Sequence, residues 1–182
     1  MNIQWEAQAY AKNFGFVPQY GEELLDLLDC PPGSPVIDLG CGNGTLTAKI
    51  AQMGYDVMGV DSSLSMIEEA RKICPNVRFV LSDALDFTAH QSACAIFSNA
   101  VFHWIDAPLH DRLLANIVSS LKAGGQLIAE FGGHGNAETV HAALERCFAK
   151  RSLAYLREFY FPTLDEYMQR LDKAGLVAAY AA

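Results

Sequence analysis

Short apolar runs alternate with longer stretches of helical period along most of this chain. From residue 34 onward, runs such as 35–39 and 93–97 are each followed by a segment whose apolar residues recur every three or four positions. This order is typical of parallel strands joined by crossover helices, and it predicts a doubly wound α/β fold with a mostly parallel sheet and helices on both faces. We expect strands at 35–39, 55–60, 77–81, 93–97 and 126–131, a sixth strand beginning at 176, and helices at 17–28, 45–53, 64–74, 109–121, 137–148 and 163–173.

The length and charge of the chain favour one domain without a nucleic-acid partner. With 182 residues, of which 51% are hydrophobic, the chain can bury one substantial core and is short for two ordinary domains. Its formal net charge of −8 argues against nucleic acid, because phosphate binding needs clustered Lys and Arg. No segment approaches the roughly 20 apolar residues that a membrane span requires, so we expect no membrane partner.

The cysteines and the N-terminal residues favour a cytoplasmic protein. The five cysteines form no C-x-x-C pair, and an odd number cannot all pair within one chain, so we expect reduced cysteines. Residues 1–6 lack the basic stretch, followed by an apolar stretch, that begins an export signal.

A glycine-rich loop stands between the first expected strand and the helix after it. Residues 36–44 read Val-Ile-Asp-Leu-Gly-Cys-Gly-Asn-Gly. In an open parallel sheet, ligands bind at the carboxyl ends of the strands, near the point where the strand order reverses. Glycines permit a tight turn there and let a ligand approach the backbone closely. The loop therefore predicts a Rossmann-like ligand site, but glycines alone do not identify the ligand.

Two carboxylates follow the next two strands and point to a nucleoside. Asp61 ends the second expected strand about twenty residues after Gly40, a position from which a carboxylate can accept hydrogen bonds from ribose hydroxyls. Asp83 follows the third strand and can accept from an adenine amino group. The alternatives are a helix-capping carboxylate for Asp61 and a turn carboxylate for Asp83.

A nicotinamide dinucleotide is the first alternative cofactor, because the same position holds pyrophosphate in other folds of this kind. Thr45 stands where the dinucleotide pattern needs its third glycine, which counts against this alternative. Asp38, directly before the loop, would repel pyrophosphate but could hold the ammonium group of a methionine moiety. Charge therefore favours a cationic cofactor.

Taken together, these segments resemble the class I methyltransferases that use S-adenosylmethionine (SAM). The resemblance runs from about residue 7 to residue 133 and is greatest for the small-molecule branch that includes trans-aconitate-type enzymes. Its motifs are Ile37 to Gly44, Gly59 to Ser63, Ser82 to Ala84, Phe97 to Ala100 with His103 and Trp104, and Leu121 to Gly125.

The resemblance implies a role for individual residues in binding SAM and its product, S-adenosylhomocysteine. Asp38, Gly40 and Gly42 would line the methionine part, and Asp61 would hold the ribose. Asp83 and Ala84 would lie beside the adenine, and Asn99 would form the floor near the sulfonium. The expected cofactor-binding set also includes Cys41, Ser62 and Met66.

The resemblance also implies how the single domain, 1–182, is organised. Residues 1–33 match an N-terminal lid and helix, in which Tyr10 and Phe16 would cover the cofactor; the alternative is that these rings belong to the core. Residues 34–133 match the cofactor-binding core. Residues 134–182 match an incomplete C-terminal part, because relatives continue into further strands.

Methyl transfer from a sulfonium is an in-line displacement for which the cofactor supplies the chemistry and the protein the orientation. A carboxylate or thiolate acceptor needs no base, whereas an alcohol or ammonium acceptor must lose a proton. His103 is the histidine expected at the mouth of the site and is the candidate base; the alternative is that it packs or caps a short helix. No other histidine has ligand spacing, so we expect no metal.

The sequence predicts an enzyme that methylates a small molecule. The segment after the fourth strand lacks the Asn/Asp-Pro-Pro-aromatic run of enzymes that methylate DNA bases. The apolar residues at 175–180 and an unpaired edge of the fifth strand could make a homodimer. Two alternatives remain open, namely a non-catalytic module that binds SAM or S-adenosylhomocysteine and a nicotinamide-dependent enzyme.

Overall fold

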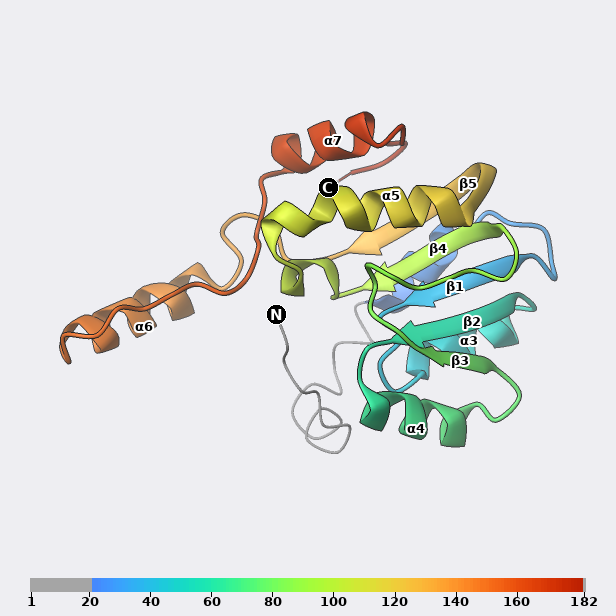
Figure 1. Ribbon diagram of the computed structural model, residues 1–182, viewed down its shortest axis with the longest axis horizontal. Helices are drawn as coiled ribbons and strands as arrows, with labels where there is room; N and C mark the ends of the chain where they lie inside the picture. The colour runs from blue at the N-terminus through green and yellow to red at the C-terminus, as the bar shows by residue number, and fades with distance from the viewer. Residues whose placement is uncertain (1–20, 182) are drawn as a thin grey trace.

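A five-stranded parallel sheet forms the centre of the computed structural model, which describes residues 21–181 (Figure 1). The sheet has the order β3-β2-β1-β4-β5, and all four pairings are parallel. The chain moves outward from β1 to β3 and then returns to the other side of β1, which confirms the doubly wound arrangement. The strands are β1 (Pro35–Leu39), β2 (Asp56–Asp61), β3 (Arg78–Leu81), β4 (Ala93–Asn99) and β5 (Leu121–Glu130).

Two of the helices begin at a residue whose side chain caps the first turn. Ser63 accepts a hydrogen bond from the Met66 amide at the start of α4, and Thr163 accepts one from the Glu166 amide at the start of α7. The helices are α3 (Thr45–Gln52), α4 (Leu64–Ile73), α5 (His110–Ser120), α6 (Glu138–Ala149) and α7 (Leu164–Lys173), with the 3-10 helices η1 (Glu23–Leu27), η2 (Phe102–Trp104) and η3 (Ala107–Leu109).

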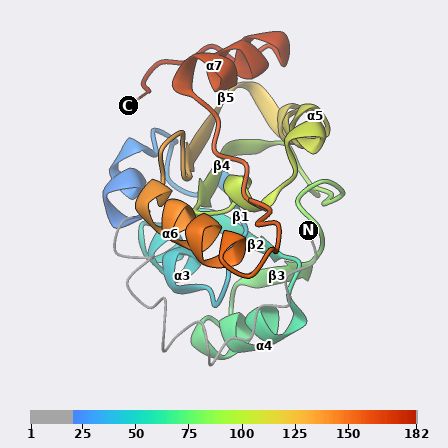
Figure 2. The same ribbon diagram turned by 90° about the vertical axis from the view of Figure 1, so that its left-hand side faces the viewer.

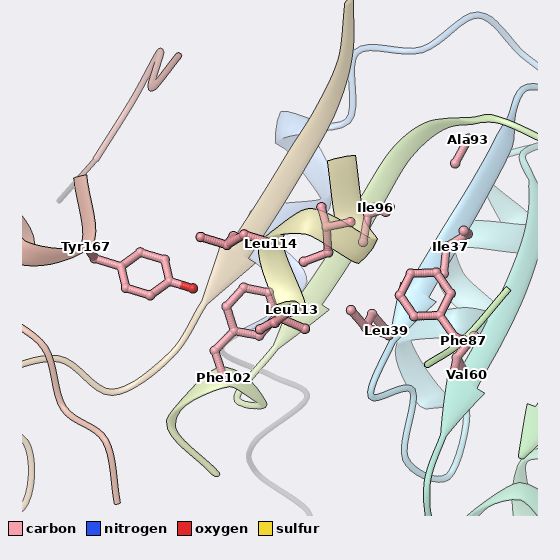
Figure 3. Close-up of a cluster of buried hydrophobic side chains, with 11 residues drawn as sticks. Ile37, Leu39, Val60, Phe87, Ala93, Ile96, Phe102, Leu113, Leu114 and Tyr167 are labelled. Carbon is pink, nitrogen blue, oxygen red and sulfur yellow. The ribbon is translucent and has the colours of Figure 1, made fainter. Parts of the chain in front are cut away.

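Apolar side chains cover both faces of the sheet. On one face α5 places Leu113, Leu114 and Ile117 against β1 and β4, with Tyr167 of α7 at the margin (Figure 3). On the other face η1 and α3 pack on β1 and β4, and α4 packs on β2 and β3. Because β4 is covered from both sides, its first six residues are all buried, as its continuous apolar sequence predicts.

Helix α6 stands away from this layered body, beyond the carboxyl ends of the strands (Figures 1 and 2). The chain returns beside it, and Arg157 forms ion pairs with Glu138 and Glu145 of the helix. His141 is buried and its Nδ1 lies 2.7 Å from the Tyr155 hydroxyl oxygen. These contacts hold α6 against the segment that returns to the body.

Three expected elements differ from the structure. The described part of the helix expected at 17–28 contains the short 3-10 helix η1. The fifth strand, expected at 126–131, begins at Leu121, and the pairing of β5 with β4 shifts between Ala93 and Ala95, near Gly124 with its φ of +71°. No strand forms at 176–180, where Val177 is 94% exposed, so the expected sixth strand is wrong for these residues.

The expectation that all cysteines are reduced is also wrong, because a disulfide joins Cys30 to Cys94. It links the segment after η1 to the second residue of β4, 64 positions later in the sequence. Cys41, Cys74 and Cys147 are free thiols. Sequence spacing cannot identify such a pair, because pairing depends on which strands become neighbours.

Within residues 21–181, no helix is long and apolar enough to cross a membrane.

Candidate functional site

A pocket opens at the carboxyl end of β1, where the strand order reverses between β1 and β4. It brings together five of the residues that the sequence predicts for the cofactor site, Asp38, Gly40, Cys41, Gly42 and Asn99. Its other lining residues are Asn43, Thr45 and Leu46. This is the position at which open α/β sheets bind ligands.

The glycine loop turns sharply because two successive amides bind the same carbonyl oxygen. The amides of Gly40 and Cys41 donate to the carbonyl oxygen of Val60, at 2.7 and 3.0 Å. Gly40 has a φ of +76°, and a Cβ atom there would lie 2.2 Å from a methyl carbon of Val101. At Gly42, with a φ of +53°, a Cβ atom would meet nothing within 4 Å. The first glycine therefore permits the bend, and the second leaves open space beside it.

Asp61 fastens the glycine loop to the start of α4. One of its carboxylate oxygens accepts from the Gly42 amide at 2.9 Å, and the other accepts from the Ser63 amide at 2.8 Å. Burial raises the pKa of Asp61, and these backbone hydrogen bonds partly offset the rise. Each carboxylate oxygen has a second lone pair, so Asp61 can still accept from a ribose hydroxyl.

Asp38 is the second carboxylate of the site and is only 2% exposed. It accepts a hydrogen bond from the hydroxyl of Thr47 in α3, at 2.6 Å. Burial raises the pKa of Asp38 to about 7, against the Thr47 hydrogen bond that lowers it, and the charge of Asp61 raises it further. A buried anion beside a second anion favours a cationic ligand group.

Four other predicted residues, like Asp61, do not line the pocket. Asp83 is exposed and accepts from the Leu85 amide at 2.8 Å, which is the turn geometry that we considered as its alternative role. Ser62 is exposed, Ala84 packs against the core, and Met66 is 3% exposed.

Asn99 lies at the end of β4, beside the N-terminal part of the described chain. A Cβ atom at Gly21 would lie 2.8 Å from the Asn99 side chain and 2.7 Å from Leu46. The backbone before η1 therefore packs directly against two residues that line the pocket. The expected lid residues Tyr10 and Phe16 lie outside the described residues.

Sequence reasoning missed three pocket residues that continue the glycine loop into α3. Asn43 accepts hydrogen bonds from the amide and the hydroxyl of Thr45, at 3.3 and 2.8 Å. Leu46 lies in a segment that the sequence predicts only as a helix, because its apolar spacing is helical. The Asn-x-Thr spacing at the helix start was the available signal for the first two.

His103 lies in η2, between β4 and α5. Its Nδ1 accepts from the Gly132 amide at 3.1 Å, so the proton of the neutral ring is on Nε2. Burial lowers the pKa of His103 to about 4. Its ring packs among Trp104, Phe159 and Phe161, with ring centroids 5.3 to 6.3 Å away. The sequence did not indicate that the segment after α6 returns to this position.

Two carboxyl groups and a glycine loop therefore meet at this end of the sheet. Asp61 at the end of β2 accepts from the Gly42 amide, Asp38 in β1 is buried, and a Cβ atom at Gly42 would meet nothing within 4 Å. Within residues 21–181, no three His, Cys, Asp or Glu side chains form a group that could hold a metal ion.

Comparison with known proteins agrees with this chemistry. Residues 36–125 match a methyltransferase domain family. The chain is 30% identical over 177 residues to a trans-aconitate 2-methyltransferase of Sinorhizobium fredii, covering 93% of this chain and 68% of the relative. The chain belongs to the class I SAM-dependent methyltransferases. An uncharacterised methyltransferase of Schizosaccharomyces pombe is 28% identical over 187 residues, covering 97% of this chain and 72% of the relative.

Solved structures show the same fold. The phosphoethanolamine N-methyltransferase 2 of Haemonchus contortus, in complex with S-adenosylhomocysteine, matches with a TM-score of 0.72 at 23% identity, covering 93% of this chain and 41% of that chain. The methyltransferase is an enzyme whose cofactor is SAM, and the nicotinamide alternative is wrong.

Asp38→Asn should show how much the buried carboxyl group of Asp38 lowers the free energy of unfolding of this methyltransferase at neutral and higher pH. Because the pKa of Asp38 rises from 3.8 to about 7, the folded protein keeps a proton that the unfolded chain loses, so stability falls as pH rises between these values. The variant removes this loss. Its stability gain over wild type should be larger at pH 8 than at pH 5 by roughly 1–3 kcal/mol.

Denaturant unfolding without cofactor measures both gains. Asp56→Asn, at the exposed start of the same sheet's β2, is the control and should show the same pH dependence as wild type. An equal gain for Asp38→Asn at both pH values would contradict a buried, titrating carboxyl.

Proposed function

We propose that this methyltransferase transfers the methyl group to a carboxylate oxygen of a small organic acid. The single observation that carries the proposal is the hydrogen bond between the Gly132 amide and Nδ1 of His103. This bond occupies the lone pair that a general base would use. A carboxylate acceptor is already ionised and needs no base, so it fits a site whose candidate base is engaged.

Two further observations support a small acid as the acceptor. A 30% identical relative carries the name trans-aconitate 2-methyltransferase, and its acceptor is such an acid. The net charge of −8 disfavours a nucleic-acid acceptor. His103 and Trp104, which follow β4, pack with Phe159 and Phe161, which follow α6, and this aromatic group would form the apolar margin of the acceptor site.

For the cofactor, we propose the residue roles that the family resemblance implies. Asp38 would hold the methionine ammonium, Asp61 the ribose, and Gly42 the open space beside them. Asp83 would contribute to the adenine side from its exposed turn. SAM, when bound, supplies an electrophilic methyl group, and these residues orient it and exclude water.

Asp61→Ala should weaken the binding of S-adenosylhomocysteine by about 1–3 kcal/mol, which is roughly 5- to 150-fold in Kd, because charge-assisted hydrogen bonds are lost. Isothermal titration calorimetry measures the change. Asp56→Ala, at the other end of β2, is the matched control and should bind like wild type. Unchanged affinity in Asp61→Ala would remove this residue from the site.

An acceptor panel tests the substrate class. Small carboxylic acids, including trans-aconitate, should yield methyl esters, whereas matched alcohols and amines should not. His103→Gln, whose amide oxygen can also accept from Gly132, should keep turnover within about threefold. A loss of about 10²–10⁴-fold in this variant would show that His103 is a base and would contradict the proposal.

We also propose that a second copy of the chain pairs with the edge of β5. Within the described part of the sheet, β5 pairs only with β4, and three consecutive residues near its start, 122–124, are exposed. An open edge favours pairing with another strand. Size-exclusion chromatography with light scattering should show a dimer at micromolar concentration, and a monomer over that range would contradict the idea.

The single-domain organisation with a lid, core and C-terminal part, and the location in the cytoplasm, also remain proposals. The chain length supports the single domain. Fractionation of cells that express the chain would test the location, and recovery outside the cytoplasm would contradict it.

A further inference from the structure

Thr47 lies behind the pocket and forms a hydrogen bond with Asp38, which lines it. It is the third residue of α3, its exposed fraction is 0%, and it is not among the residues that line the pocket. Its hydroxyl oxygen lies 2.6 Å from one carboxylate oxygen of Asp38. A ligand in the pocket would touch Asp38 but not Thr47.

The direction of this hydrogen bond follows from the two groups. An ionised carboxylate can only accept, so Thr47 donates its single hydroxyl proton to Asp38. A threonine in a helix can instead donate its hydroxyl proton to a carbonyl oxygen of the preceding turn of the helix. Here the hydroxyl donates to Asp38 of β1. A hydrogen bond to an anion is short and stronger than one between neutral groups, as the distance here indicates.

The bond matters because the neighbours of Asp38 oppose its negative charge. Asp61 on β2 repels it, and burial removes it from water. The Cys41 thiol in the loop is held neutral, since burial and both carboxylates raise its pKa by more than its hydrogen bonds, one of them with Thr47, lower it. The paired positions on the adjacent strands, Gly59 and Phe97, carry no charge. Lys49, the basic residue of α3, pairs with Glu22.

We propose that Thr47 is a positioning residue of the cofactor site: its hydroxyl fixes the orientation of the Asp38 carboxylate and stabilises its charged form, so that Asp38 can bind the ammonium group of the cofactor. The inference rests on the proposed cofactor role of Asp38. If Asp38 binds the ammonium group, cofactor affinity depends on pH through the ionisation of Asp38. A substitution at Thr47, which does not line the pocket, should then shift this pH dependence.

The sign follows from linkage. Binding of the ammonium group favours ionised Asp38, so affinity should be constant above the pKa of this carboxyl and fall about tenfold per pH unit below it. Thr47→Val has a similar shape and no hydroxyl, so it should raise that pKa. The midpoint of the affinity profile should move upward by about 0.5–1 pH unit, since a hydrogen bond of this kind stabilises by about 0.5–1.5 kcal/mol.

Calorimetric titration with S-adenosylhomocysteine between about pH 5.5 and pH 8 gives the profile for each variant. Thr47→Ser keeps the hydroxyl and should restore the wild-type midpoint. Asp38→Asn should bind weakly without a pH step in this range. Carbon-13 NMR of the Asp38 carboxyl in the protein without cofactor gives its pKa directly and should show the same upward shift in Thr47→Val.

The outcomes separate this inference from the proposed function. If wild type fails to bind S-adenosylhomocysteine at any pH, the proposed cofactor site is wrong. If wild type binds but Thr47→Val keeps the wild-type midpoint and the wild-type carboxyl pKa, the role of Thr47 is overturned. If Thr47→Val does not fold, Thr47→Ser decides alone: a midpoint moved away from wild type despite the retained hydroxyl overturns the inference, and an unmoved one supports it.

Discussion

The hydrogen bonds of the Asp61 carboxylate are the interaction on which the glycine loop and the proposed cofactor site depend. Its two oxygens accept from the Gly42 and Ser63 amides and so join two strand-to-helix connections that are separate in sequence. Without this carboxylate, both amide N–H groups would lose their acceptor at a partly buried position, which destabilises the loop. The bend that begins at Gly40 therefore keeps its shape because Asp61 of the neighbouring strand β2 binds the Gly42 amide at the other end of the bend.

The site then places the carboxyl group of Asp38, which lines the pocket, near that of Asp61, which holds the glycine loop. Burial raises the pKa of both Asp38 and Asp61, and Asp61 adds to the rise at Asp38. Such an arrangement destabilises the protein without ligand and favours a ligand that brings a positive charge. A sulfonium cofactor with an ammonium group meets this requirement, whereas a pyrophosphate would add to the repulsion. The electrostatics of the site thus agree with the family to which the chain belongs.

The cofactor side of the fold was predictable because its signals are local. The Val-Ile-Asp-Leu run, the glycines after it and Asp61 at the end of β2 are contiguous or separated by one helix, and parallel strands bring their carboxyl ends together. Thr47 was not identified, because a threonine inside a helical period gives no sign that its hydroxyl reaches an adjacent strand.

The features that sequence reasoning missed depend on contacts between distant segments. The glycines at 124 and 125 suit a turn as well as the irregularity that β5 adopts, and only the pairing with β4 decides between them. The disulfide between Cys30 and Cys94, and the return of Phe159 and Phe161 to His103, join residues whose neighbourhood follows from the complete fold. Tyr10 and Phe16 stay predictions.

The contact between Val101 and Gly40 joins the proposed acceptor region to the proposed cofactor region. Val101 occupies the space that a side chain at Gly40 would need, and it immediately precedes η2, which carries His103 and Trp104. The segment that borders the proposed acceptor region is therefore seated on the bend that shapes the cofactor region. Evolution of a new acceptor preference through the length or sequence of this segment would be limited by the need to keep a residue of valine's size against the bend.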